Sequence, residues 1–158
     1  LATGQSTPTS QKSYKASTMP YGSKENPFNP LEVMLACGAS FISRGYPVRK
    51  EHYGRLLKEA VLHKGFSIVD TLQVCITFNN LYEEYNKNAF EFSGGPSSNI
   101  DEALKIIRSW NYEGIGQPIP LGIFYQAERP CFEEGFAWFR DEPRDRTAKI
   151  DSLLEKLR

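Results

Sequence analysis

The sequence predicts an α/β protein with a mostly parallel sheet and helices packed against it. An amphipathic helix is expected over 50–64, where apolar residues recur at spacings of three and four. The segments 66–72 and 119–127 are apolar without strict alternation, which is typical of strands covered on both faces. A strand expected at 40–43, the helix and the strand at 66–72 then form a βαβ unit with a right-handed crossover.

The chain begins with an expected loop. Residues 1–29 lack a sustained apolar period and are rich in proline, glycine and hydroxyl side chains. Long loops in compact domains are usually functional or disordered, so we expect a cofactor or a partner to order this one. Asn29 and Pro30 suit the cap and first position of a helix, which Gly38 is placed to end.

The pattern beyond residue 80 is weaker. A short helix is expected over 81–90 and a better one over 100–110, where Asn99 is the cap and Glu102 is positioned for a capping box. Pro120 interrupts the last apolar strand. Since proline has no N–H to donate, that strand is expected at an edge of the sheet.

We divide the chain into three parts: a cofactor- or partner-contacting loop over 1–29, an α/β unit over 30–134 and a charged tail over 135–158. An apolar stripe predicts that the tail ends in a helix, and its residues are Ile150, Leu153, Leu154 and Leu157. The first residue is Leu1 rather than methionine, within a polar stretch, so we expect a segment of a longer protein.

Composition restricts the partners and the compartment. The 158 residues include 19 Lys+Arg and 19 Asp+Glu, a balance that gives no reason to expect nucleic acid or a membrane surface as a partner. No apolar run approaches the ~20 residues that span a bilayer, and the sequence shows no secretory signal. Three well-separated cysteines argue against a disulfide framework, so we expect a reducing compartment, the cytoplasm.

Cys75 is the most suggestive single residue. It follows an apolar strand, and ligands of open α/β sheets bind beyond the carboxyl ends of strands, which would suit metal binding or covalent chemistry. A lone cysteine is also commonly a small buried side chain, so both interpretations stay open on the residues alone. Cys37, in an apolar helix, is expected in the core, and Cys131 is expected to be a free thiol without a role.

Other candidate residues give weaker signals. His52 and His63 are eleven residues apart on one helix, too far for both to reach one metal ion. Gly4 and Gln5, followed by several hydroxyl side chains, could supply donors to a phosphate. They do not form a P-loop, because no Gly-Lys-Ser/Thr follows.

Six segments, in order along the chain, resemble the β subunit of 2-oxoacid:ferredoxin oxidoreductases. They are GQSTPTS at 4–10, ENPFNP at 25–30, FISRG at 41–45, HKGFS at 63–67, LQVCITFN at 72–79 and PLGIFY at 120–125. The similarity extends from Leu1 to about Glu133 and corresponds to the carboxyl-terminal half of that subunit. The resemblance therefore implies that this chain forms part of a thiamine-diphosphate-binding-like fold.

This resemblance implies thiamine diphosphate, Mg²⁺ and a [4Fe–4S] cluster as cofactors. Cys75 falls where the family has its fourth cluster cysteine, whereas the other three cysteines and the Mg²⁺ site lie in the amino-terminal half. Leu1 falls where the family has a residue near the thiazolium ring, with Gly4 and Gln5 beside it. The implied metal ligand is therefore Cys75, and the implied cofactor-binding residues are Leu1, Gly4 and Gln5.

The implied reaction is the coenzyme A-dependent oxidative decarboxylation of a 2-oxoacid with electron transfer to ferredoxin, carried out together with an α subunit. Two departures stand out: Thr3 replaces a lysine common in members with a broad 2-oxoacid range, and Val74 and Ile76 replace the usual prolines beside the cysteine. Two alternatives remain. One is a non-catalytic α/β assembly module with a core Cys75, and the other is a cluster-free thiamine-diphosphate decarboxylase half.

Overall fold

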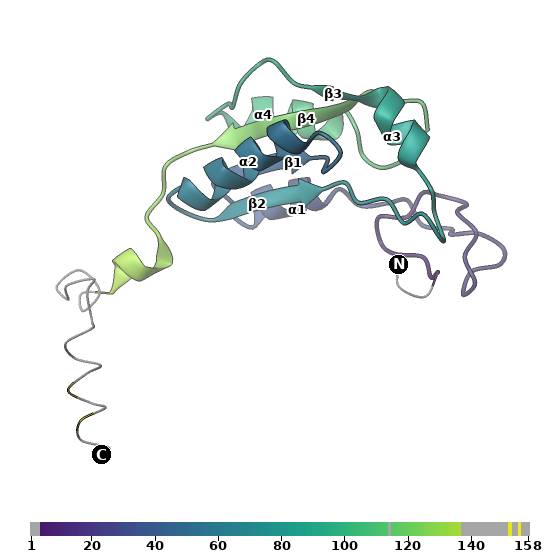
Figure 1. Cartoon of the computed structure of the whole chain (residues 1–158), viewed down its shortest axis with the longest axis horizontal. Helices are drawn as coiled ribbons and strands as arrows, with labels where there is room; N and C mark the ends of the chain where they lie inside the picture. The colour runs from purple at the N-terminus through teal and green to yellow at the C-terminus, as the bar shows by residue number, and fades with distance from the viewer. Residues whose placement is uncertain (1–3, 114, 137–151, 153–154, 156–158) are drawn as a thin grey trace.

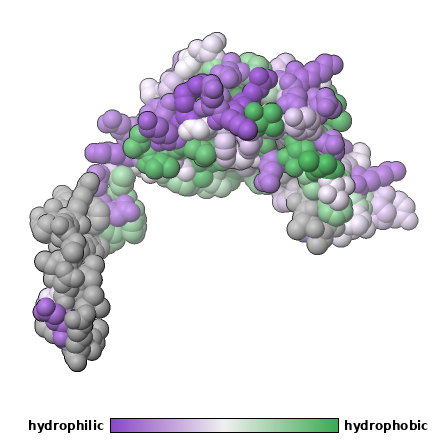
Figure 2. Space-filling view, in the orientation of Figure 1, coloured by the Kyte–Doolittle hydropathy of each residue, from purple (hydrophilic) through white to green (hydrophobic). Residues whose placement is uncertain are grey.

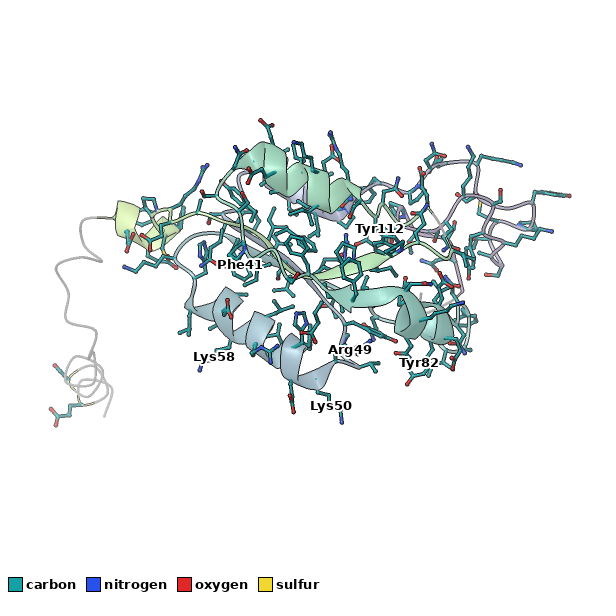
Figure 3. The ribbon with its side chains drawn as sticks, turned by 90° about the horizontal axis from the view of Figure 1, so that it is seen from above. Phe41, Arg49, Lys50, Lys58, Tyr82 and Tyr112 are labelled. Atoms are coloured by element: carbon teal, nitrogen blue, oxygen red, sulfur yellow. The ribbon has the colours of Figure 1, made fainter. Side chains whose placement is uncertain are left out.

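A computed structural model describes residues 4–113, 115–136, 152 and 155. Its helices lie on both faces of a four-stranded sheet (Figures 1 and 3). One face is covered by α2 (Lys50–Leu62), and the other by α1 (Pro30–Ala36) and α4 (Ile100–Arg108). The predicted α/β class with flanking helices is confirmed. The expected terminal helix and Leu1 lie outside the described residues, apart from two isolated positions of the tail.

The sheet has the strand order β2-β1-β4-β3. Its strands are β1 (Phe41–Gly45), β2 (Ser67–Thr71), β3 (Ala89–Glu91) and β4 (Ile119–Gln126). The pairs β1–β2 and β3–β4 are parallel, whereas β1 and β4 are antiparallel, so the sheet is mixed. One βαβ unit is β1–α2–β2 and the other is β3–α4–β4, and their strands run in opposite directions where β1 meets β4. The hydrophobic periodicity within each unit does not predict this relative direction.

Short elements complete the chain: α3 (Tyr82–Asn88) leads into β3, and a single 3-10 turn covers Phe132–Gly135. No helix in the described part of the chain has the length and apolarity needed to cross a bilayer. Hydrophilic side chains cover much of the face that carries α2 (Figure 2).

Two predicted helix caps are confirmed, and one of them joins two helices. The Asn29 side chain accepts from the Leu31 N–H at 3.1 Å and donates to the Ile107 carbonyl at 3.0 Å, which ties the start of α1 to α4. Asn99 caps α4. The capping box expected for Glu102 is wrong, because the Asn99 N–H donates to the Ser97 hydroxyl, which itself donates to Glu102.

The burial of the strands corrects two expectations. β1 and most of β4 are buried, but β2 is only partly buried because it is an edge strand. β4, predicted at an edge, is central instead. Pro120 is tolerated there because β3 pairs with 119–121 and β1 pairs with 122–126, so β4 is paired on one side only at the proline.

The core consists of two apolar clusters. The first lies between the sheet and the α1–α4 layer, and its residues are Leu31, Leu35, Ala39, Ile42, Ala103, Ile107, Phe124 and Tyr125. The second comprises Tyr46, Leu72, Ala89, Trp110, Ile119 and Leu121. The register of β4 against β1 shifts at Phe124, and such a bulge lets the neighbours Phe124 and Tyr125 pack into one cluster.

Two further segments differ from expectation. Cys37, expected in the core, is exposed because it is the carboxyl-terminal cap of α1 rather than part of its inner face. Residues 4–29 are irregular, as predicted, but make hydrogen bonds of their own. The Ser13 N–H donates to the Ser23 carbonyl at 2.8 Å, and the Ser23 N–H to the Tyr14 carbonyl at 3.0 Å. That a cofactor or partner contacts this loop stays a prediction.

We expect Ile107→Ala to lower the free energy of unfolding by about 2–5 kcal/mol, because Ile107 is fully buried in the first cluster and the change leaves a cavity. Val61→Ala is the matched control: Val61 is 83% exposed on α2, so a change within about 0.5 kcal/mol is expected. Urea denaturation of both variants measures this. Equal losses would contradict the placement of the α1–α4 layer.

Candidate functional site

An open hollow of about 600 Å³ lies where β2 ends, between the chain that follows this strand and the first segment. Hydroxyl residues of the first segment form one side, and aromatic residues from α3 and from beyond α4 form another. Its lining includes Thr7, Thr9, Ser10, Asp70, Cys75, Tyr85, Trp110 and Tyr112. The position agrees with the expectation that ligands of α/β sheets bind beyond strand ends.

Cys75 lies in a tight turn at this hollow. A bridge between Cys75 and Asn79 closes the turn, in which the Asn79 N–H donates to the Cys75 carbonyl at 2.9 Å. Hydrogen bonding from the Phe78 backbone N–H, with smaller contributions from Asn79 and Thr77, lowers the pKa of the Cys75 thiol despite its partial desolvation. The turn therefore stabilises a thiolate, the form in which cysteine binds metals.

The first segment contacts this turn directly through Gly4. The backbone of Gly4 has a φ of +68°, and a Cβ added there would lie 2.7 Å from the Phe78 ring. The Tyr14 hydroxyl donates to the Phe78 carbonyl at 2.9 Å. Two residues that sequence analysis singled out separately, Gly4 and Cys75, are thus joined through Phe78. Gln5 follows with its side chain exposed.

A buried ion pair lies beneath the hollow. Arg44 on β1 is fully buried, and its Nε donates to Oδ2 of Asp70 on β2 at 2.7 Å. The Tyr112 hydroxyl donates to the same oxygen. The guanidinium carbon lies 4.7 Å from the ring centre of Trp110 and 5.4 Å from that of Tyr112, so the cation is stacked on aromatic faces.

Tyr112 is held in an unusual conformation. Its φ is +68°, a region that non-glycine residues adopt at a cost of about 1 kcal/mol or more. Burial, and then the charge of Asp70, raises the pKa of its phenol, so the hydroxyl stays protonated and donates to the carboxylate. Packing of the Tyr112 ring against Trp110, at 4.3 Å between ring centres, helps to hold it in place.

Sequence reasoning missed this ion pair, although a signal for it existed. A charged residue occurs in each of two adjacent apolar strands, and Arg44 and Asp70 are register partners in the parallel pair. The histidines contribute nothing to the hollow: His63 contacts the Ser40 hydroxyl at 2.9 Å, and His52 is buried on α2. Cys131 is a free thiol, as predicted.

The described residues do not complete a metal site by themselves. No group of three or more His, Cys, Asp or Glu side chains within them could hold a metal ion. Cys75 lines the hollow with one thiol, and a [4Fe–4S] cluster, which usually needs four thiolates, would require ligands from outside these residues.

Comparison with known proteins identifies the family. Residues 75–141 match the family model for the C-terminal region of the pyruvate ferredoxin oxidoreductase β subunit, a match that begins at Cys75. The chain is 31% identical over 134 residues to the β subunit of 2-oxoacid:ferredoxin oxidoreductase 1 from Aeropyrum pernix, which covers 79% of this chain and 42% of the relative. The chain corresponds to the carboxyl-terminal region of a 2-oxoacid:ferredoxin oxidoreductase β subunit.

Other β-subunit relatives agree. A 2-oxoacid:ferredoxin oxidoreductase β subunit from Sulfolobus sp is 32% identical over 145 residues, with 85% of this chain and 47% of that protein covered. The structure of a 2-oxoglutarate:ferredoxin oxidoreductase from Magnetococcus marinus, with 2-oxoglutarate, coenzyme A and succinyl-CoA bound, matches 96% of this chain and 53% of that chain. Its TM-score is 0.78 at 28% identity. The chain thus spans about half the length of each of these three proteins.

The contact between Gly4 and Phe78 can be tested by Gly4→Ala. The added methyl group meets the Phe78 ring, so we expect faster amide hydrogen exchange across Thr77–Asn79, measured by mass spectrometry. Gly95→Ala is the matched control, because Gly95 has the same φ of +68° but nothing within 4 Å of an added Cβ. Unchanged exchange in Gly4→Ala would show that the first segment does not support the Cys75 turn.

Proposed function

We propose that this chain is the carboxyl-terminal part of a thiamine-diphosphate-binding β subunit. The complete enzyme would carry out the coenzyme A-dependent oxidative decarboxylation of a 2-oxoacid and pass the electrons to ferredoxin. The observation that carries the proposal is the Cys75 turn, which offers a stabilised thiolate at the edge of a large open hollow. The similarity of the chain to 2-oxoacid:ferredoxin oxidoreductase β subunits supports the same conclusion.

Cys75 fits one ligand of a [4Fe–4S] cluster. Cys75 is partly exposed and lines the hollow, and three consecutive backbone N–H groups, those of Thr77, Phe78 and Asn79, lower the pKa of its thiol. Hydrogen bonds of this kind to cluster sulfurs are among the factors that set reduction potentials. The remaining three thiolates would come from outside this chain.

The resemblance supports a contact between the first segment and thiamine diphosphate. Gly4 is buried against the Phe78 ring, and its carbonyl accepts from the Ser17 N–H at 3.2 Å and the Ser17 hydroxyl at 3.1 Å, so the segment is held next to the Cys75 turn. We assign Leu1, Gly4 and Gln5 to this contact, with Mg²⁺ and the diphosphate held elsewhere in the subunit. When bound, thiamine diphosphate supplies the carbanion chemistry of decarboxylation.

Gly4 and Gln5 do not line the hollow, whereas hydroxyl residues later in the first segment do. The Thr7 N–H donates to the Ser10 hydroxyl at 2.8 Å, and the hydroxyls of Thr7 and Thr9 are 3.2 Å apart. These contacts link neighbouring residues of the segment that lines the hollow. This chain's own role is thus to supply one thiolate and to position the backbone beside the cofactor.

We infer an α subunit, ferredoxin, coenzyme A and a 2-oxoacid as partners. The β-subunit relatives imply an α subunit, and the Magnetococcus marinus protein was solved with 2-oxoglutarate and coenzyme A bound. All three cysteines of this chain are free, which agrees with a reducing compartment, so we place the protein in the cytoplasm. A purely structural Cys75, as in an assembly module, would be expected in the core rather than at the hollow.

The decisive variant is Cys75→Ser in the complete β subunit, purified with its α subunit. Because oxygen is a poor replacement for a soft thiolate on iron, we expect iron content and the cluster's electron paramagnetic resonance signal to be lost or altered. Electron transfer to ferredoxin should fall with them. Thiamine diphosphate binding, which rests on the Mg²⁺ site elsewhere, should be better preserved.

Cys37→Ser and Cys131→Ser are the matched controls and should leave iron content and the signal unchanged. Equal iron in Cys75→Ser and the wild type would return Cys75 to a structural role and remove the link to electron transfer. A wild-type complex that decarboxylates a 2-oxoacid but contains no iron would instead support the cluster-free decarboxylase.

A further inference from the structure

We propose that the buried pair of Arg44 and Asp70 sets the reduction potential of the cluster that Cys75 would bind, with the two charges acting in opposite directions. This inference rests on the proposed function. It concerns residues of this chain that the chemistry at Cys75 does not itself use.

The ion pair lies at the same hollow as Cys75. Arg44 and Asp70 are register partners on β1 and β2, and the Asp70 side chain is 14% exposed and lines the same hollow as Cys75. Cys75 lies only five residues beyond Asp70, so their Cα atoms are at most about 18 Å apart even if the connecting chain is extended. Both residues therefore act on one region of the molecule.

The hydrogen bonds to the Asp70 carboxylate are asymmetric. The Arg44 Nε and the Tyr112 hydroxyl both donate to Oδ2 of Asp70, and neither bond involves Oδ1. Arg44 lies behind the carboxylate and is fully buried against Trp110 and Tyr112. A negative charge thus faces the hollow, with a positive charge fixed behind it.

Hydrogen bonds satisfy this buried pair only in part. Both terminal nitrogens of Arg44, Nη1 and Nη2, are buried without a hydrogen-bond partner among the residues that the structure describes. Charged nitrogens in that situation are costly, and buried ion pairs are often replaced by apolar residues without loss of stability. Stacking on aromatic rings offsets only part of that cost. An incompletely bonded buried cation is a reason to look for a functional role of its charge.

That role follows from electrostatics. Charges interact more strongly in a protein interior than in water, and salt screens buried charges less than exposed ones. Reduction adds an electron to the cluster, so the Asp70 carboxylate disfavours it and the Arg44 guanidinium favours it. Net charge and solvent exposure are known determinants of cluster potential. The reduction potential of the cluster should therefore rise if the Asp70 charge is removed and fall if the Arg44 charge is removed.

The test is a redox titration of the cluster, followed by electron paramagnetic resonance, in the complete β subunit with its α subunit. Asp70→Asn removes the negative charge with little change of shape, so the reduction potential should rise. Arg44→Gln removes the positive charge, so the potential should fall, and Arg44→Lys should restore it toward the wild-type value. Asp101→Asn, the same change on the exposed first turn of α4, should leave it unchanged.

Each outcome separates the two proposals. A wild-type complex without a cluster overturns the proposed function. A loaded cluster whose potential is equal in the wild type and Asp70→Asn overturns the inference while leaving the proposed function intact. Shifts in the same direction for Asp70→Asn and Arg44→Gln also overturn it, because distortion and not charge would then explain them. If Arg44→Gln fails to fold, the near-isosteric Asp70→Asn decides.

Discussion

The ion pair between Arg44 and Asp70 ties the buried strand β1 to the edge strand β2 at the place where the hollow opens. Arg44 projects from the same face of β1 as Ile42 and Tyr46, which belong to the two apolar clusters, so the cation lies between these clusters. The carboxylate in turn orients Tyr112, whose strained backbone closes one wall. Position and charge in this region therefore depend on one contact.

A second set of contacts supports the Cys75 turn. Backbone N–H groups after Cys75 stabilise its thiolate, and Gly4 and Tyr14 hold Phe78 in place from the first segment. The irregular segment is thereby joined to the sheet through the same turn that presents the thiol. A ligand at Cys75 and a cofactor at Gly4 would share this support, which suits electron transfer between neighbouring groups.

Much of the fold follows from local rules. The caps at Asn29 and Asn99 and the helix over 50–62 depend on neighbours in sequence, so they were predictable. The direction of β4, its central position and the partial exposure of β2 depend on how two βαβ units meet, which no local pattern contains. Cys75 was singled out by its position after a predicted strand and by the family resemblance, and its role as a metal ligand stays a prediction. The ion pair of Arg44 and Asp70 was not predicted, because each residue taken alone is only a charge within an apolar strand. Their pairing becomes visible only once the register of β1 against β2 is known.

Anomalous scattering at the iron absorption edge tests most directly whether Cys75 binds iron at the hollow. In crystals of the complete β subunit with its α subunit, we predict an iron cluster in the hollow, with one iron atom bonded to the Cys75 sulfur. A cluster held entirely by other side chains, or a Cys75 sulfur turned away from the iron, would contradict it.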